Sequence, residues 1–173
     1  MRPVSNVAVL MFCACSTLQI APFSRDFCRP QPVLLVGSSD ATAQLATNVQ
    51  RRLGPQYPLA FEPTTQADHL TVTVVEYDYR QLSKQVQNTG GGFGGSVPIA
   101  VPQYEIKYEP EATVRIRVQS LNTSREYTGL VTGVPFRPSE SPGIPREQLL
   151  DLASKSAVQQ FANDLKACDG ASK

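Results

Sequence analysis

The sequence contains a single histidine, His69, and no two cysteines spaced as C-x-x-C. A zinc site made of histidine and cysteine needs more ligands than this, and an imidazole base for nucleophilic catalysis has only one candidate. An excess of positive charge is also missing, because 16 lysines and arginines are balanced by 15 aspartates and glutamates. Nucleic-acid binding needs clustered surplus base. We therefore expect no metal, no cofactor, no histidine-dependent chemistry and no nucleic-acid partner.

A phosphate-binding glycine loop is missing as well, although residues 88–96 place five of the 11 glycines within six consecutive positions. A phosphate loop lies between a strand and a helix, whereas the residues after Ser96 include Pro98 and Pro102 and look extended. We interpret the stretch as the tip of a hairpin. Its apolar residues are a candidate contact with membrane, lipid or protein, or they fold back over the sheet. They are Phe93, Val97, Ile99 and Val101.

The first residues have the pattern of a secretory signal. Arg2 precedes a mostly apolar run from Val4 to Ala14, which is too short to span a bilayer as a mature helix. Residues 12–15 resemble a bacterial lipobox, which predicts a signal peptide over 1–14 and a lipid on Cys15. In that sorting pattern, an aspartate directly after the lipidated cysteine retains a protein at the inner membrane. Ser16 occupies this position here, which implies the outer membrane. An ordinary signal cleaved after Ala21 is the alternative.

Two of the four cysteines remain once the signal and the lipid are assigned. Cys28 and Cys168 would then share an oxidising compartment, where two thiols are expected to pair. Such a disulfide closes a loop of about 140 residues and stabilises the fold by at most roughly 5 kcal/mol in the chain-entropy model. The alternative is two unpaired thiols near the chain ends.

Hydrophobic periodicity predicts the elements of one domain over residues 32–169, with a tether over 15–31 and a tail over 170–173. The apolar run 32–37 indicates a buried strand, and Leu45, Val49 and Leu53 mark one face of a helix that stops at Gly54. Residues 57–63 predict a brief edge strand, because a proline there cannot donate a ladder hydrogen bond. A second apolar stripe predicts a helix over 146–167.

Two long strands carry the clearest signal. Apolar residues occupy even positions from Tyr104 to Val118, and charged residues occupy odd ones, so one side of this strand should face the core and the other water. In the strand over 69–86 the apolar phase shifts by one residue at Val75, which predicts a bulge or a strand that is apolar on both faces. A further strand follows over 127–136.

The element order is thus β-α-β-β-β-β-α. Sequential strands usually lie side by side, so we expect an α+β fold with an antiparallel sheet and both helices on one of its faces. Glu76 and Asp78 share a face of one strand and are the only paired carboxylates considered for acid–base work. A solvated strand face explains them better, and we expect a protein that is not an enzyme.

The order of these elements is similar to that of the lipopolysaccharide-assembly lipoprotein family. The shared pattern consists of the lipobox-like Cys15, the strand at 32–37, the helix before Gly54, the long strands and the last helix. The resemblance covers roughly residues 32–167 and is one of pattern. Members of that family plug an outer-membrane barrel and help to pass lipopolysaccharide outward. Auxiliary lipoproteins of lipid-exporting transporters and curli-secretion-type lipoproteins share the pattern.

The resemblance implies a lipid-anchored protein on the periplasmic face of the outer membrane. We expect an accessory or scaffold in moving lipid, polysaccharide or protein across the envelope, with a barrel or transporter component as partner. The alternative is a module that binds an apolar or glycolipid ligand against its sheet.

Overall fold

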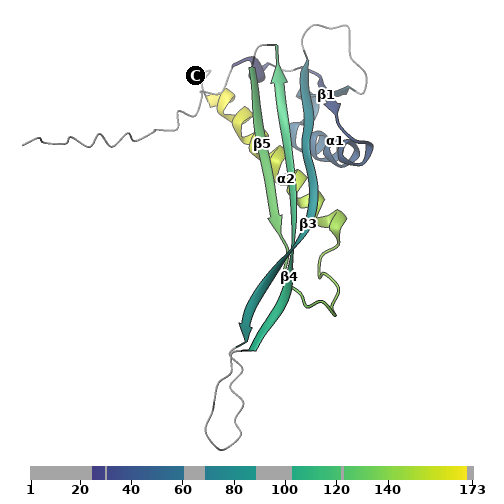
Figure 1. The fold of residues 1–173 in the computed structure, drawn as a ribbon. Coiled ribbons are helices and arrows are strands. Elements are labelled where there is room, and N and C mark those ends of the chain that lie inside the picture. Colours follow the sequence, from purple (N-terminus) through teal and green to yellow (C-terminus); the bar gives the residue numbers. More distant parts are fainter. Residues whose placement is uncertain (1–24, 30, 61–68, 89–102, 122, 171–173) are drawn as a thin grey trace, which may run out of the picture.

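The computed structural model describes residues 25–29, 31–60, 69–88, 103–121 and 123–170, and only these are discussed below (Figure 1). The predicted β-α-β-β-β-β-α order is confirmed, with two short 3-10 helices added. The elements are η1 (Arg25–Cys28), β1 (Val33–Val36), α1 (Ser39–Leu53), η2 (Gly54–Gln56), β2 (Leu59–Ala60), β3 (Leu70–Asn88), β4 (Gln103–Ser120), β5 (Thr123–Thr132) and α2 (Arg146–Gly170).

The five strands form one sheet in the order β2-β1-β3-β4-β5. β1 is parallel to both β2 and β3, while β3, β4 and β5 are antiparallel neighbours. The expectation of an antiparallel sheet is therefore wrong for β1 and β2. α1 carries the chain back along the sheet, so that β2 starts from the same end as β1 and pairs with it in parallel. The predicted edge strand is confirmed, since β2 lies at the margin of the sheet.

The predicted bulge is present at Val75. The register between β3 and β4 shifts between Val74 and Glu76, so that Val75 has no partner of its own. Leu70 and Val72 face the core before the bulge, and Tyr77 and Tyr79 pack against it afterwards. The extra residue keeps apolar side chains on the helix side of the strand after the phase shift.

Both helices pack against the same side of the sheet, where the core lies (Figure 1). The α1 stripe is buried as predicted, with Leu45 and Val49 at most 1% exposed. On α2 the predicted stripe is also buried, and Phe161 is its largest fully buried side chain. The even-numbered residues of β4 from Ala112 to Val118 complete this core. Hydrophobic burial therefore holds this part of the sheet against the two helices.

A polar cluster links the two helices. Asn48 of α1 donates to Ser154 Oγ at 3.1 Å, and Asp151 accepts from Asn48 and Gln44. Asp151 also pairs with Lys155. Burial acts to raise the pKa of the Asp151 carboxyl, but the hydrogen bonds from Lys155, Asn48 and Gln44 outweigh it and hold that pKa below its usual range. This cluster fixes how α1 and α2 sit against each other.

The predicted disulfide joins Cys28 to Cys168, with 5.7 Å between their Cα atoms. It connects η1 to the last turns of α2 and closes a loop with a sequence separation of 140. The segment that leads to the N-terminus is thereby fastened to the end of α2. We call this disulfide and the adjoining parts of η1 and α2 the tether end.

Candidate functional site

β3 and β4 continue well past the rest of the sheet. β1 ends at Val36, opposite Thr73, and β5 ends at Thr132, opposite Glu111. Beyond these points β3 and β4 pair with each other as far as Asn88 and Gln103. We call residues 80–88 and 103–111 the ribbon. Figure 1 shows it projecting away from the helices and from the tether end.

One face of the ribbon is apolar on β4 and carries polar amides on β3. Tyr104 and Ile106 are 58% and 54% exposed, and they lie opposite Gln87 and Gln85. We predicted that this side of the strand would face the core. That is wrong for these two residues, because the helices end before they reach them. Neighbouring exposed apolar side chains of this size are typical of a contact surface.

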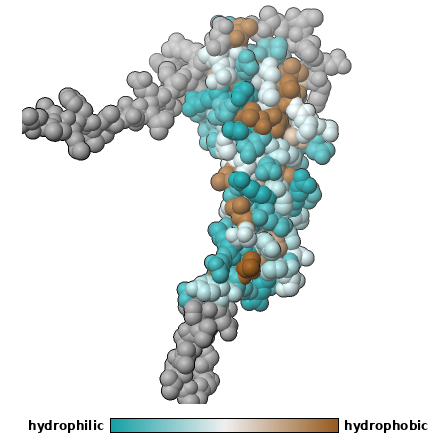
Figure 2. Space-filling model, in the orientation of Figure 1, coloured by the Kyte–Doolittle hydropathy of each residue, from teal (hydrophilic) through white to brown (hydrophobic). Residues whose placement is uncertain are grey.

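The other face of the ribbon alternates apolar and charged residues. Leu82 and Val86 are 37% and 39% exposed on β3. Between them Lys84 pairs with Glu109 across the strands, as expected for a solvated face with cross-strand ion pairs. In Figure 2 the projecting part of the molecule accordingly shows isolated brown residues among teal ones. The ribbon thus offers apolar side chains on both of its faces.

The base of the ribbon is braced by the segment that follows β5. Tyr108 and Phe136 exchange two backbone hydrogen bonds, at 2.8 and 2.9 Å, and their rings lie 6.0 Å apart. Gly133 N–H donates to the Pro110 carbonyl at 2.7 Å. Phe136 is only 9% exposed as a result. This bracing, together with an ion pair between Arg137 and Glu105, holds the ribbon at a defined angle to the domain. Tyr104 and Ile106 nevertheless remain more than half exposed.

The open face of the sheet carries a ladder of ion pairs. Glu76 lies 3.3 Å from Arg115, and Glu126 of β5 contacts Arg115 at 3.8 Å and Arg117 at 2.6 Å. Glu76 therefore has a cationic partner, whereas Asp78 lies opposite Thr113. The two carboxylates considered for acid–base work have these different neighbours. Among the described residues, no group of three or more acidic, histidine or cysteine side chains could hold a metal ion.

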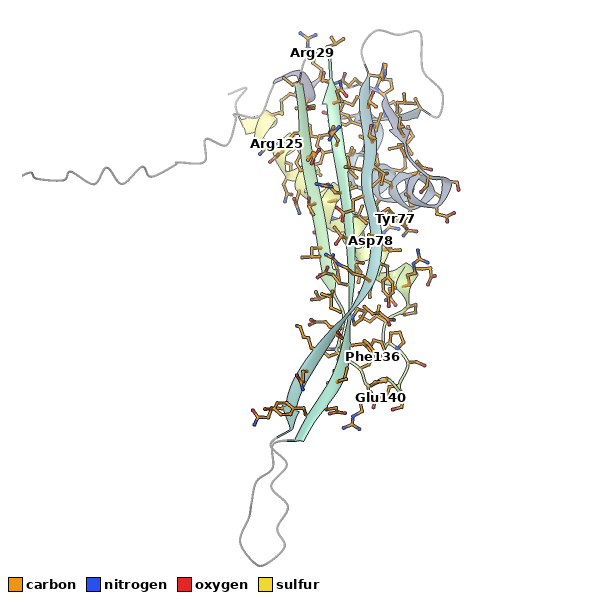
Figure 3. All side chains as sticks on the ribbon, in the orientation of Figure 1. Arg29, Tyr77, Asp78, Arg125, Phe136 and Glu140 are labelled. Carbon is orange, nitrogen blue, oxygen red and sulfur yellow. A yellow bond between two sulfur atoms is a disulfide. The ribbon has the colours of Figure 1, made fainter. Side chains whose placement is uncertain are left out.

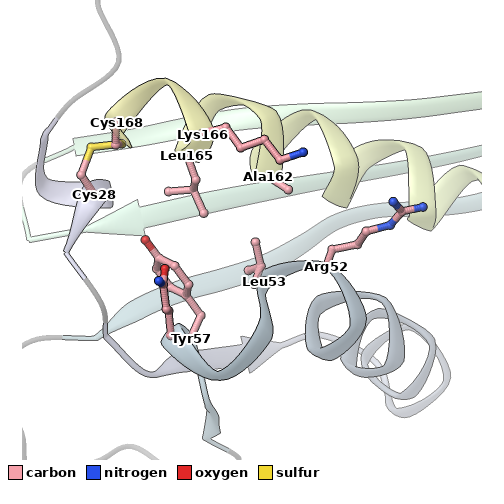
Figure 4. A pocket seen from close by; sticks show the side chains of 9 residues that line it. Cys28, Arg52, Leu53, Tyr57, Ala162, Leu165, Lys166 and Cys168 are labelled. Carbon is pink, nitrogen blue, oxygen red and sulfur yellow. A yellow bond between two sulfur atoms is a disulfide. The ribbon is translucent and has the colours of Figure 1, made fainter. Parts of the chain in front are cut away.

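A small cavity lies at the tether end, between the C-terminal parts of α1 and α2 (Figure 4). Its volume is about 120 Å³, and its walls include the disulfide, Leu53 and Leu165. Tyr57, which also lines it, donates from its hydroxyl to the Phe27 carbonyl at 3.0 Å. Arg52 and Lys166 complete one side. Ligand pockets usually measure roughly 300 to 1,000 Å³, so this cavity is small for an organic ligand.

Several predicted site residues lie outside the described residues. These are the lipidation candidate and the four apolar residues of the predicted hairpin tip: Cys15, Phe93, Val97, Ile99 and Val101. The ribbon leads directly to the segment that contains those four. Tyr104 and Ile106 were missed as exposed residues. The predicted strands over 69–86 and 104–118 are longer than the strand over 127–136. This difference in length was the signal that could have identified Tyr104 and Ile106 as uncovered.

No family model matches the chain, and no curated protein matches it. Among solved structures, the chain is similar to a crystal structure of a minor lipoprotein from Acinetobacter baumannii. The two are 12% identical with a TM-score of 0.45, and the match covers 80% of this chain and 94% of that one. No helix in the described part of the chain has the length and apolar character needed to cross a membrane.

Proposed function

We propose that this chain is a non-enzymatic lipoprotein, anchored by Cys15 to the periplasmic face of the outer membrane. It acts as an accessory or scaffold protein that docks its ribbon onto a barrel or transporter component of an envelope assembly or transport system. The lipobox-like sequence around Cys15 supports the anchor. The disulfide supports an oxidising compartment outside the cytosol.

The observation that carries the docking role is the exposure of Tyr104 and Ile106 on a braced ribbon. Leaving two large apolar side chains in water is unfavourable, at about 25 cal/mol for each Å² of apolar surface. Burial against a partner recovers this free energy. A ribbon that is already ordered loses little conformational freedom on binding, which favours affinity.

The arrangement of the two ends supports the same role. The tether joins the domain at Cys28, and the ribbon projects from the opposite end (Figure 1). At about 3.3 Å per residue, the ribbon extends roughly 25 to 30 Å beyond the end of β5. An anchored domain would thus present the ribbon well away from its point of attachment, where it can reach a second component.

The experiment is a pull-down of the tagged full-length protein from detergent-solubilised membranes. The wild-type protein should recover a barrel or transporter component. The double variant Tyr104→Ser, Ile106→Ser should recover it at least about tenfold less, since we expect both residues to be central anchors of the interface, whose truncation costs more than about 1 kcal/mol each.

The matched control replaces two other exposed apolar residues, Leu121 and Leu130, which are 71% and 56% exposed and lie off the ribbon. The variant Leu121→Ser, Leu130→Ser should recover the partner as the wild type does. Equal recovery by the ribbon variant, with the fold intact by circular dichroism, would contradict the docking role.

The alternative of a module for an apolar ligand gains no support from the cavity at the tether end, which is too small for one. Native mass spectrometry of the purified domain tests it directly. A co-purified lipid or glycolipid would favour the ligand-binding alternative over the docking role.

A further inference from the structure

Unpaired positive charge is concentrated at the tether end. Among the described side chains, Arg29, Arg52 and Lys166 are exposed and make no ion pair. Most of the other described cations, in contrast, have carboxylate partners: Arg80, Lys84, Lys107, Arg115, Arg117, Arg125, Arg137 and Lys155. Arg146, at the start of α2, makes no ion pair with a described residue, but its guanidinium lies 6.0 Å from the centre of the Tyr79 ring. In a chain that is nearly neutral as a whole, three described cations at this end are thus left without an ion-pair partner among the described residues.

These three cations come from different elements that the fold brings together. Arg29 follows Cys28 directly, and the disulfide holds Cys28 against Cys168 on α2. Arg52 on α1 and Lys166 on α2 line the same cavity beside that disulfide (Figure 4). Figure 3 places Arg29 at the end of the molecule opposite Phe136 and Glu140. We call Arg29, Arg52 and Lys166 the basic end.

Asp164, the described acidic side chain nearest to Lys166 along α2, already has partners of its own. Asp164 precedes Lys166 by two residues on α2, but its carboxylate is 3.2 Å from Arg125 and accepts a hydrogen bond from Tyr127 at 3.0 Å. Arg51, which adjoins Arg52, also makes no ion pair with a described residue. It adds to the positive potential here.

Helix stability explains only part of this charge. Arg51 and Arg52 lie in the last turn of α1, where positive charge is favourable next to the free carbonyl groups. Arg29 lies outside both helices, so the same effect does not account for it. A shared external partner of negative charge accounts for all of them.

We propose that the basic end is a docking surface for an anionic phospholipid bilayer. The proposed anchor at Cys15 identifies this occupant, because the segment from Cys15 to Cys28 spans at most about 45 Å even when fully extended. The basic end therefore lies within reach of the membrane surface. One lipid anchor with a basic patch binds a membrane more durably than either signal alone. The surface would orient the domain with its ribbon pointing away from the bilayer.

The test uses the chain from Ser16 to Lys173, which contains every described residue and lacks the lipid. It is prepared oxidised and mixed with vesicles of phosphatidylcholine alone or with phosphatidylglycerol added. Each cation near an anionic surface strengthens binding about fivefold. The wild type should bind the anionic vesicles at low salt and the neutral ones at least about tenfold less. The variant Arg52→Glu, Lys166→Glu should lose that preference.

The control variant Lys84→Glu, Arg137→Glu makes the same change in net charge on the ribbon and on the segment that contacts it, and it should keep most of the binding. If both variants lose binding equally, net charge and not the basic end is responsible, and the proposal is wrong. Wild type that ignores anionic vesicles, or that binds inorganic phosphate without binding vesicles, also overturns it. Should charge reversal unfold the domain, Arg52→Gln, Lys166→Gln provides the same comparison.

This result is separable from the proposed function. If the chain binds anionic vesicles but carries no lipid on Cys15, the proposal for the basic end is supported and the proposed anchor is wrong. If the chain is lipidated and recovers its partner but does not distinguish the two vesicles, the proposed function is supported and the proposal for the basic end is wrong.

Discussion

Gly129 of β5 lies directly under the backbone of Ala153 in α2. A Cβ atom built on Gly129 would come within 1.9 Å of the Ala153 carbonyl oxygen and 2.9 Å of the Ala157 amide nitrogen. Both atoms belong to the main chain of the helix and cannot move aside as a flexible side chain would. The distance between α2 and the sheet is therefore set by the absence of a side chain at this position.

Replacing Gly129 with alanine should lower the free energy of unfolding by about 3 kcal/mol, because α2 must shift to accommodate one methyl group. Urea unfolding followed by circular dichroism measures this. Gly143 is the matched control, since a Cβ there meets nothing within 4 Å and needs no positive φ. Gly143→Ala should stay within about 0.5 kcal/mol of the wild type. Equal effects of the two substitutions would refute the close approach.

The disulfide should contribute strongly to stability. The double variant Cys28→Ser, Cys168→Ser should lose about 3 to 5 kcal/mol, because the bridge restricts a long loop in the unfolded chain. Unfolding of the wild type in a thiol reductant should match unfolding of the variant without it. An unfolding midpoint that does not respond to reduction would show that the bridge is absent from the folded protein.

Tyr127 should make stability fall at alkaline pH. Burial raises the pKa of its hydroxyl, and the charge of Asp164 and the hydrogen bond to it act in the same direction. The folded state thus holds this proton more tightly than the unfolded state, whose tyrosine has a pKa of about 10. The contribution is complete below about pH 10 and is lost as the pH rises further, at up to about 1.4 kcal/mol per unit. The stability of wild type should therefore fall more steeply there than that of Tyr127→Phe. Parallel curves would contradict this assignment.

The anchor predicts a covalent adduct. The protein extracted from membranes should have the mass of a chain that begins at Cys15 and carries a diacylglyceryl group. Cys15→Ala should lack it and leave the membrane fraction. A mass equal to a chain that begins after Ala21 would establish the ordinary secretory signal instead.

Hydrophobic periodicity predicted the helices and strands well, because the buried face of each element follows from the spacing of apolar residues within that element. Leu45 and Val49 repeat with the helical period and are buried on α1, and the phase shift at Val75 corresponds to a true bulge. Cys28 and Cys168 could be paired by elimination. Each of these features depends on a few residues and one general principle.

Two features depended on parts of the fold that no local pattern records. The parallel pairing of Val33 with Leu59 and Leu70 follows from the route of the chain through α1. The exposure of Tyr104 depends on where β5 and the helices end, since its alternation with Glu105 is the same as that of buried residues farther along β4. The candidate site was therefore recognised as a strand, and its lack of cover was not.

The central claim is that the ribbon contacts a partner in the envelope. A photoreactive amino acid at Ile106 tests it most directly, with the same residue at Leu130 on the open face of the sheet as a control. On irradiation of living cells, the account predicts a specific cross-linked protein from position 106 and much less of it from position 130. Cross-links to that protein from position 130 alone, or no cross-link from position 106 in a folded, membrane-bound chain, would contradict it.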